Sequence, residues 1–589
     1  MRISQMLALA RRRFWRAARL RQCQLGSPRL RSPLRPLVLN EWPEWEPELA
    51  FSMIGKREFR FLNVTRKSPD GIPWSSRELS RLWLYHLNYF DFLNINLSSP
   101  SQAPLLSAAL KLALDWRRQN LTGDETGWEP YPLSIRIVNW LKFLLRNAES
   151  AERCDGGRSV WQLLDSLCTQ AQTLESKLEV DLMANHLLKN AKALIFAGAL
   201  IQFPESDRWL QKGVAILEQQ LREQILPDGG HFERSPMYHC QALEDLLDLH
   251  ALSAVTGRPL ACERKLTKQA QRMAVFLRDL RHPDGEIPLF GDSALNTARP
   301  AGELLHRAAS IAKARDGQRD PAVFRDTGYA VMRDGDGGCL VFRCGPLGPE
   351  YQPGHGHCDL LSYELSLKGS RVVADTGVST YEPGPDRYYE RSTCAHNTLR
   401  VNGKEQAEIW GSFRVGRRPK AGRIETGIDG GCRFLRGEHF GYQRLGVIHR
   451  RTIFHVPEGA WLVADTLRGN ADRRIESFIH FHPDVHVERH SNRSLAMESS
   501  PATRWLVQFR DYSYLLVILG RGEVQLKQSW YAPEFGVRQM RPVIHWSLKQ
   551  PLPALMAYAF VPCGSPLADH CQISLSGSVE IGPLILNKL

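Results

Sequence analysis

Residues 354–377 read GHGHCDLLSYELSLKGSRVVADTG. The second half alternates apolar and polar residues on both sides of Lys368-Gly369, a turn dipeptide, and therefore predicts a β-hairpin. A tight hairpin there places Asp375 opposite Tyr363. In the first half, His355 and His357 occupy alternate positions, and side chains at i and i+2 of a strand share one face. We therefore expect a strand that presents two imidazoles to the same side.

The same alternation continues through the C-terminal half of the chain. Apolar and polar residues alternate between glycine-containing turns in GCLVFRCGP, RTIFHVPEGAWLVADTLRG, RRIESFIHFHPDVHVER and RWLVQFRDYSYLLVILGRGEVQL. Runs of this kind, separated by turns at intervals of roughly eight to twelve residues, are typical of an antiparallel β-sandwich.

Upstream, the pattern changes to helical periodicity. From about residue 75 to 315, apolar residues recur three and four positions apart in eight successive stretches, with short Pro-, Gly- and Asp-rich breaks. Many helix pairs in series predict a toroid or solenoid of α-hairpins. We expect three parts: a basic extension over 1–40, an all-helical domain over 41–318 and an all-β domain over 319–589.

The net charge of +13 is concentrated at the N-terminus. Residues 1–40 contain ten arginines, no lysine and no acidic residue, and the remainder has 66 basic and 63 acidic side chains. A near-neutral body argues against a general nucleic-acid surface. The stretch from Met6 to Leu20 is amphipathic, and either contact with anionic lipid or a solvated extension is consistent with it.

Targeting signals and cysteine motifs are weak. MLALA at 6–10 is too short for the apolar core of a secretory signal, and no stretch has the apolar length of a membrane span. These features predict a soluble protein without a standard cleavable signal, cytoplasmic by sequence. The twelve cysteines form no CxxC pair, so neither a thiolate zinc finger nor a disulfide framework is indicated.

Two candidate site stretches lie in the helical region. In ANHLLKNAKAL (184–194), Asn185 and His186 open a helix, either as a cap with a surface histidine or as hydrogen-bond donors. In LPDGGHFERSPMYH (226–239), a glycine loop carries a polar cluster with Glu233, Tyr238 and His239, or simply turns the chain.

Two further candidates lie in the β region. The histidine stretch, together with Asp375 and His396 downstream, has ligand types that zinc prefers, although simple hairpin register does not bring Asp375 to His357. The stretch TYEPGPDRYYERSTCAHNT (380–398), with Tyr381 and Arg391, either binds an anionic sugar or lines a polar loop.

Together these motifs resemble the heparinase II/III-like family of polysaccharide lyases. The resemblance covers about residues 75–560 and is most specific in GHGHCDLLSYELSLKGSRVVADTG and STCAHNTLRVNG. The N-terminal matches, GWEPYPLSIRIVNWLKF, NHLLKNAKAL and ERSPMYH, are individually weaker but fall in the right order. It implies an incomplete (α/α) toroid followed by an antiparallel β-sandwich. That architecture agrees with the helical and β patterns read independently.

The resemblance also implies an activity. Such lyases cleave a glycosidic bond beside a uronic acid by β-elimination, which requires removal of the weakly acidic C5 proton. Asn185 and His186 match donors that neutralise the uronate carboxylate, and Tyr238 matches the catalytic acid and base. His186 is a candidate base for the opposite epimer, and His355 matches a residue that contacts substrate.

The resemblance further implies a structural zinc ion held by His357, Asp375 and His396. The partner it implies is an acidic polysaccharide, and the candidate substrate-binding residues are Tyr381, Arg391, Glu233 and His239.

Two departures leave alternatives open. Lys189 stands where some heparinases have an acidic residue, so heparin itself is not indicated as substrate. Secreted lyases of external polysaccharide carry a secretory signal, and no standard one is recognised here. This departure fits an inactive or weakly active polysaccharide-binding accessory of capsule or exopolysaccharide assembly. Family analogy also allows a location in the periplasm or cell envelope. Hydrolysis by paired carboxylates is another alternative, with Glu233, Asp228 and Asp292 as candidates.

Overall fold

The computed structural model describes residues 28–31, 42–120, 126–311, 317–490, 502–569, 571–573, 579–581 and 584–587. The chain forms two compact units. The first comprises Met1–Ile225, Gln241–Gln271 and Ser310–Ala312, and the second comprises Leu226–Cys240, Arg272–Ala309 and Lys313–Leu589. Two stretches that are early in the sequence therefore belong to the second unit.

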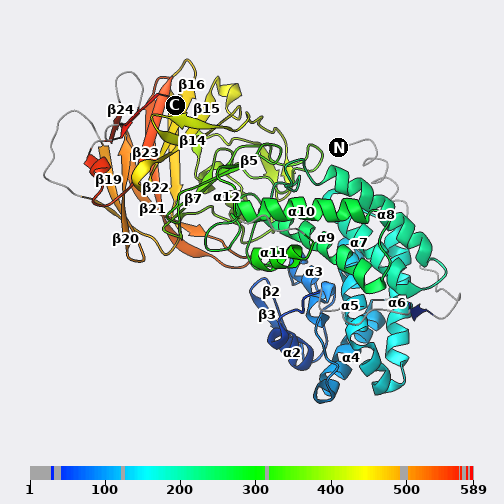
Figure 1. The fold of residues 1–589 in the computed structure, drawn as a ribbon. Helices are drawn as coiled ribbons and strands as arrows, with labels where there is room; N and C mark the ends of the chain where they lie inside the picture. Colours follow the sequence, from blue (N-terminus) through cyan, green and yellow to red (C-terminus); the bar gives the residue numbers. More distant parts are fainter. Residues whose placement is uncertain are drawn as a thin grey trace. The chain divides into compact units, whose positions relative to one another are not determined.

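The eight expected helices are all present, which confirms the helical half of the predicted fold (Figure 1). The helices are α2 (Pro47–Lys56), α3 (Arg81–Tyr89), α4 (Ala103–Gln119), α5 (Pro130–Asp155), α6 (Arg158–Ser176), α7 (Ala184–Leu200), α8 (Ser206–Glu223), α9 (Pro236–Thr256), α10 (Glu263–Leu280), α11 (Ala301–Ala309) and α12 (Pro385–Glu390). The division between the units falls within α9 and within α10.

Helix α7 lies at the centre of the helical unit, and most of its side chains are buried. Two glycines allow α7 and α8 to approach closely. A methyl group at Gly198 would lie 2.5 Å from the backbone nitrogen of Leu210, and one at Gly213 would lie 2.7 Å from Ile195 Cγ1. Because larger side chains do not fit at these positions, the helix pair that carries Asn185 and His186 is tightly fixed.

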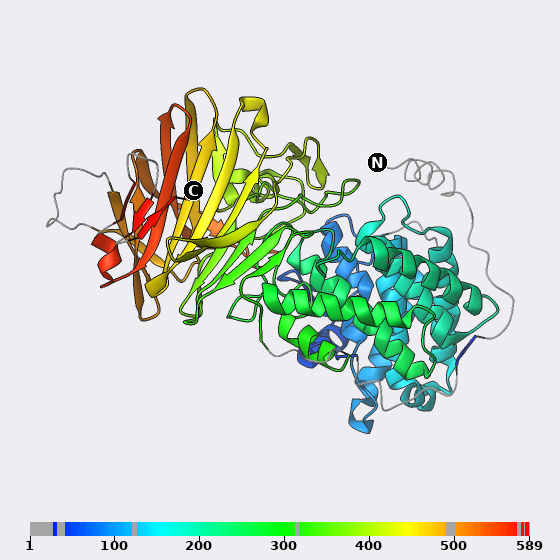
Figure 2. The ribbon, with the colours of Figure 1, turned by 45° about the horizontal axis from the view of Figure 1, so that its top comes forward.

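The second unit is built from antiparallel sheets, as the alternating pattern predicts. Figure 2 shows the long strands of its largest sheet side by side. The five-stranded sheet has the order β5-β6-β7-β8-β9. Its strands are β5 (Ala322–Phe324), β6 (Tyr329–Arg333), β7 (Cys339–Arg343), β8 (Tyr363–Leu367) and β9 (Ser370–Val373).

The other two large sheets have eight and four strands, in the orders β13-β14-β15-β16-β23-β20-β19-β18 and β10-β17-β22-β21. Their strands are β10 (Leu399–Val401), β13 (Glu425–Asp429), β14 (Cys432–His439), β15 (Ile448–Val456), β16 (Ala460–Arg468), β17 (Arg473–His480), β18 (His486–Arg489), β19 (Ala502–Phe509), β20 (Tyr512–Leu519), β21 (Glu523–Tyr531), β22 (Gln539–Gln550) and β23 (Ala554–Pro562). One buried cluster joins side chains of all three sheets, including Leu340, Trp461 and Ile475. Shared burial between sheet faces is the packing of a β-sandwich.

Short strands complete the described structure. These are β1 (Arg29–Leu30), which pairs with β4 (Ile201–Gln202), the β2 (Glu58–Phe61) and β3 (Val64–Lys67) hairpin, β11 (Ile409–Gly411) with β12 (Arg414–Val415), and β24 (Cys571–Ile573), β25 (Val579–Ile581) and β26 (Leu584–Leu586). Most of the predicted basic extension over 1–40 lies outside the described residues. The predicted division at residue 318 stays a prediction. Among the described helices, none combines the length and apolar character needed to cross a membrane.

Residues 354–377 form the predicted hairpin but not the predicted strand that would contain His355 and His357. Strands β8 and β9 pair through Leu365 with Val373 and Leu367 with Ser370, around a turn in which Lys368 and Gly369 have positive φ. The expectation that His355 and His357 lie on a strand is wrong, because residues 354–362 are irregular and β8 begins only at Tyr363.

Candidate active site

Tyr238 lies at the start of α9 and packs against His355. The two ring centroids are 4.0 Å apart, and the Tyr238 hydroxyl is 3.2 Å from the hydroxyl of Tyr381. Ser235 caps this turn, since its Oγ accepts a hydrogen bond from the Tyr238 backbone nitrogen. The second unit thus brings together a phenol, an imidazole and a second phenol that the sequence separates by more than a hundred residues.

One buried carboxylate, Asp292, contacts both histidines of the H-x-H stretch. Asp292 Oδ2 lies 2.9 Å from His355 Nδ1, and Asp292 Oδ1 lies 2.9 Å from His357 Nε2. The Arg387 guanidinium donates to both oxygens, at 2.5 and 2.8 Å. The two imidazoles therefore converge on one residue, although they are not on a strand.

These contacts determine the charge of Asp292. Burial alone would raise the pKa of this carboxyl, but the Arg387 charge and the two histidine hydrogen bonds hold it well below its usual range. An ionised carboxylate only accepts hydrogen bonds, so the proton of a neutral His355 is assigned to Nδ1. The other nitrogen, Nε2, lies 3.9 Å from Glu233 Oε2.

Tyr381 is held on three sides within the same unit. Its ring contacts Phe413 and Phe535 at centroid distances of 5.0 and 4.8 Å, and the Arg387 guanidinium carbon lies 4.9 Å from its centroid. The ring is partly exposed. A partly exposed aromatic ring beside the Tyr238 hydroxyl is suited to contact with a sugar.

The three predicted metal ligands are all buried in the second unit. The His357 and His396 rings have centroids 5.4 Å apart, and Asp375 Oδ2 lies 2.8 Å from His396 Nδ1. Burial lowers the pKa of His357 to about 3. Burial also lowers the pKa of His396, but the Asp375 carboxylate outweighs it and raises that pKa above its ordinary value.

A zinc ion fits the donor types at this position. His357 Nδ1 and His396 Nε2 are buried without a hydrogen-bond partner among the described residues, and a buried unpaired nitrogen is costly unless something binds it. The opposite nitrogen of His357 is held by Asp292, as in carboxylate–histidine–metal arrangements, whereas both oxygens of the candidate ligand Asp375 lie against His396 Nδ1. Within the described ranges, no three ligand side chains already lie close enough to hold an ion.

Asn185 and His186 lie in the helical unit, in the first turn of α7. Asn185 is buried, whereas the His186 side chain is 29% exposed. The His186 ring lies against Tyr131 with centroids 4.4 Å apart, and its Nδ1 is 3.0 Å from Glu179 Oε1. Glu179 was not anticipated from the sequence, since nothing in its local pattern marks it.

Arg391 and His239 are placed differently from the other predicted substrate-binding residues. The buried Arg391 guanidinium donates to the carbonyl oxygens of Gly354, Gly356 and Ser412 and also to Gly411. His239 is buried against Phe276, and burial lowers its pKa to about 3. These contacts fix the fold locally, so this structure does not support a direct contact of either side chain with a sugar.

Two of the three carboxylates considered for hydrolysis, Asp228 and Asp292, are held by other contacts. Asp228 accepts hydrogen bonds from the backbone nitrogen and hydroxyl of Thr327, at 2.7 and 2.6 Å, and from Gly230. Asp292 forms a buried ion pair with Arg387. Glu233 Oε2 lies near His355 Nε2. Because Asp228 and Asp292 are each held by the contacts above, these three residues do not form an acid and base pair of the glycosidase type.

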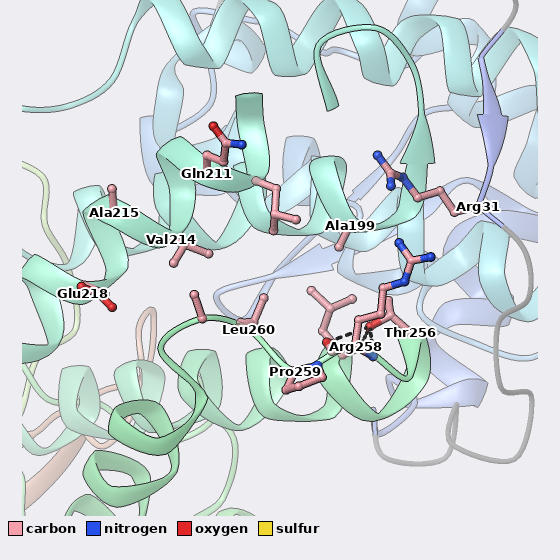
Figure 3. A pocket seen from close by; sticks show the side chains of 13 residues that line it. Arg31, Ala199, Gln211, Val214, Ala215, Glu218, Thr256, Arg258, Pro259 and Leu260 are labelled. Carbon is pink, nitrogen blue, oxygen red and sulfur yellow. Dashed lines mark hydrogen bonds between the residues drawn. The ribbon is translucent and has the colours of Figure 1, made fainter. Parts of the chain in front are cut away.

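A separate pocket of about 470 Å³ lies within the helical unit (Figure 3). Val214 and Leu260 line its middle, with Glu218 and Arg258 towards its two ends. It includes none of the candidate residues named above. Its lining is mostly apolar.

Comparison with known proteins decides the family. A model described as Heparinase II/III N-terminus matches residues 89–314, and one described as Heparinase II/III-like, C-terminal, matches residues 316–574. Together they cover most of the chain. It belongs to the heparinase II/III-like family.

The chain is similar to relatives with different names. A heparin-sulfate lyase of Bacteroides stercoris is 25% identical over 312 residues, covering 49% of this chain and 44% of the relative. The FtsZ-localized protein C of Caulobacter vibrioides is 27% identical over 418 residues, covering 69% of this chain and 67% of the relative. The chain spans about half the length of the heparin-sulfate lyases that it matches.

The heparinase III crystal structure has the same fold. It superposes with a TM-score of 0.72 at 16% identity, covering 99% of this chain and 94% of that one. At this identity the likeness shows the fold alone. It confirms the prediction of a helical half followed by an antiparallel β half in a heparinase II/III-like protein.

Proposed function

We propose that the protein is a polysaccharide lyase that cleaves an acidic, uronate-containing polysaccharide by β-elimination. The observation that carries this proposal is the contact between Tyr238 and His355, with His355 oriented by the ionised Asp292. Family membership and the heparin-sulfate lyases among its relatives support the reaction class.

The reaction requires three catalytic functions. The C5 proton is acidic only because a carboxylate stands next to it, so the enzyme must neutralise that carboxylate, remove the proton and protonate the leaving oxygen. In this proposal Asn185 and His186 neutralise the uronate. Tyr238 takes the C5 proton and returns one to the leaving oxygen when both lie on one face of the sugar. His186 is the base for the opposite C5 epimer.

Tyr238 needs help to serve at neutral pH, since the ordinary pKa of a tyrosine is near 10. Its neighbours are suited to provide it. The His355 ring lies against the phenol, and in a neutral imidazole with its proton on Nδ1 the other nitrogen, Nε2, is an acceptor. The Tyr381 hydroxyl at 3.2 Å is a donor to a phenolate. Glu233 and Tyr381 are the two predicted sugar-contacting residues whose placement beside this group supports the assignment.

We also propose a structural zinc ion held by His357, His396 and Asp375. The unpartnered nitrogens of the two histidines support it. When bound, zinc would supply a fixed positive charge that holds the surrounding loops in shape. Asp292 would then orient His357 as well as His355, because it accepts a hydrogen bond from each ring.

A second candidate is a family member that binds its partner without turnover. The relative from C. vibrioides supports this second candidate, because that protein is named as FtsZ-localized and not for a lyase activity. An accessory of capsule or exopolysaccharide assembly belongs to this class. It would have no need for a proton-transferring tyrosine beside an oriented imidazole.

Incubation with a panel of uronate polymers separates these functions. Unsaturated sugar ends, detected by their ultraviolet chromophore, support the lyase. Saturated ends would instead establish hydrolysis. Retention on a glycan column with no cleavage of any polymer would establish binding without turnover.

A further inference from the structure

Two exposed aromatic side chains lie on the β11–β12 hairpin. Trp410 in β11 is 63% exposed, and Phe413 in the turn is 41% exposed. The Trp410 side chain forms no hydrogen bond and no ring contact with another described residue. Single exposed apolar residues are common, but two aromatic rings on one short hairpin form an apolar surface that is typical of a binding site.

The backbone of the hairpin gives Trp410 its position. Ile409 pairs with Val415, and Gly411 pairs with Arg414. The register therefore shifts at Trp410, the extra residue, as in a β-bulge. Ile409 and Val415 pack against a small buried cluster, whereas the indole is left in solvent. Bulges of this kind are common beside functional sites, because they redirect a side chain.

The tip of the hairpin is fixed by the residues around Asp292. Arg387, which pairs with Asp292, also donates through Nη2 to the Ser412 carbonyl oxygen at 2.8 Å. Arg391 donates to the same oxygen at 2.9 Å. Because two buried guanidinium groups hold one carbonyl oxygen, the hairpin presents its aromatic rings from an anchored position.

Phe413 makes the hairpin continuous with the candidate active site. The centroid of its ring lies 5.0 Å from that of Tyr381 and 5.9 Å from that of His355. Tyr381 in turn lies beside the Tyr238 hydroxyl. The exposed surface of the hairpin therefore begins at the side chains that the proposed function assigns to substrate.

The hairpin and the residues that follow it are basic. Residues 408–420 contain Arg414, Arg417, Arg418 and Lys420 but only one acidic residue, Glu408. Arg414 is exposed, and its guanidinium forms no hydrogen bond or ion pair with another described residue. Since the chain beyond residue 40 is near neutral, this local excess of positive charge indicates an anionic partner.

We propose that Trp410 and Arg414 form a binding site for an acidic polysaccharide beside the reacting position. The indole stacks on the face of a sugar ring, whose C–H groups an apolar ring can cover, and the guanidinium pairs with an anionic group of the chain. The proposal rests on the substrate class of the proposed function but not on turnover, because a chain that is bound without cleavage uses the same surface.

The test measures binding of fluorescein-labelled alginate, hyaluronan and heparan sulfate to protein that carries Tyr238→Phe, so that no chain is cleaved. Trp410→Ala in this background is expected to weaken affinity for the polymer that binds most tightly by about 10-fold, and Trp410→Phe should keep most of it. Trp161→Ala is the matched control. Trp161 is 47% exposed on α6, which carries no candidate site residue, and its loss should leave the affinity unchanged.

Arg414→Gln separates the charge from the ring. It is expected to weaken binding by about 3-fold at about 0.05 M salt and to have little effect at about 1 M salt, where charges are screened. The loss caused by Trp410→Ala should persist at the higher salt. An effect of Arg414→Gln on alginate shows that a carboxylate suffices, and an effect confined to heparan sulfate shows that a sulfate is required; either supports the proposal.

Equal affinity of Trp410→Ala and its parent, an equal loss in Trp161→Ala, or no binding of any of the three polymers would overturn the proposal. Self-association of the protein that Trp410→Ala abolishes, without an effect on polymer binding, would overturn it in favour of contact between two copies of the chain.

These outcomes are separate from failure of the lyase proposal. Binding that depends on Trp410, with no chromophore formed by wild type, would contradict the lyase alone. Cleavage by wild type with unchanged binding by Trp410→Ala would contradict the binding site alone. If wild type cleaves a polymer, Trp410→Ala should raise KM with kcat nearly unchanged.

Discussion

The rings of Tyr238 and His355 lie 4.0 Å apart within one compact unit, although 116 positions separate them in the sequence. The contact depends on residues that hold the imidazole from behind. Gly291 has a φ of 58° and approaches the His355 carbonyl so closely that a methyl group would lie 2.9 Å from it. The next residue is Asp292, whose backbone and side chain both bind His355.

The Asp292–Arg387 pair should be strongly coupled in stability. Asp292→Asn leaves the buried Arg387 charge without its ionised partner, and we expect the free energy of unfolding to fall by about 3–5 kcal/mol. Arg387→Gln added to it should restore part of that loss. Urea denaturation of the two single variants and the double variant measures the coupling, and strictly additive effects would contradict it.

This pair also has a defined pH dependence. Since the folded-state pKa of Asp292 is held below its ordinary value, its stabilising contribution is complete above the ordinary range of aspartate and is lost as the pH falls through the folded-state pKa. The difference in unfolding free energy between wild type and Asp292→Asn should therefore begin to shrink when the pH falls below the ordinary range of aspartate, and a difference that stays constant there would contradict this.

Lys142 in the helical unit should also make stability rise with pH, but in the alkaline range. Burial lowers the pKa of Lys142 to about 8, despite the hydrogen bond to Asp248 at 2.7 Å. The unfolded chain keeps this proton up to the ordinary lysine range, so stability from Lys142 rises with pH above about 8. Relative to Lys142→Met, wild type should gain about 2 kcal/mol between about pH 7.5 and about pH 9.5. A difference that is flat across this range would exclude the assignment.

Metal content tests the proposed zinc ion without any substrate. Wild type is expected to bind one zinc per chain, and His396→Ala should lose it, since the variant removes an imidazole with an unpartnered nitrogen. His486→Ala, an exposed histidine on β18, is the control and should retain the metal. Equal metal content in wild type and His396→Ala would remove the proposal.

Tyr381 and Arg391 should respond differently to substitution, although both come from one polar stretch. Tyr381→Phe removes a hydroxyl 3.2 Å from that of Tyr238 and should lower kcat about 10-fold with little change in stability. Arg391→Gln removes donors from buried carbonyl oxygens and should lower the free energy of unfolding by about 1–3 kcal/mol. The reverse pattern, with Arg391→Gln stable and impaired only in substrate affinity, would restore Arg391 as a sugar-binding residue.

The parts of the fold that depend on local pattern could be predicted from the sequence. The helical period identified α3 to α10, and the Lys368-Gly369 turn between alternating runs identified β8 and β9 with their register. These features are set by neighbours a few residues apart, so one segment contains the information that decides it.

The incorrect prediction of a strand at His355 and His357 shows what local alternation cannot reveal. Alternation favours a strand only if another strand satisfies its backbone, and here the carbonyl oxygens of Gly354 and Gly356 accept from the Arg391 guanidinium instead. Arg391 is more than thirty residues away in sequence. No local period reveals that a side chain replaces a neighbouring strand.

The candidate site could be predicted only in part for the same reason. The motifs identified Tyr238, His355, His357, Asp375 and His396 as residues of interest, but not that Asp292 contacts both His355 and His357. Asp292 was considered only for hydrolysis, because its partners lie more than sixty positions downstream. Such long-range pairs follow from the packing of loops in the folded unit.

The most direct test of the central claim is formation of the unsaturated-sugar chromophore by wild type and by Tyr238→Phe on the same uronate polymer. The account predicts a steady rise in ultraviolet absorbance with wild type and a loss of at least about 1,000-fold with the variant, at unchanged thermal stability. A Tyr238→Phe protein that still generates the chromophore at the wild-type rate would contradict it.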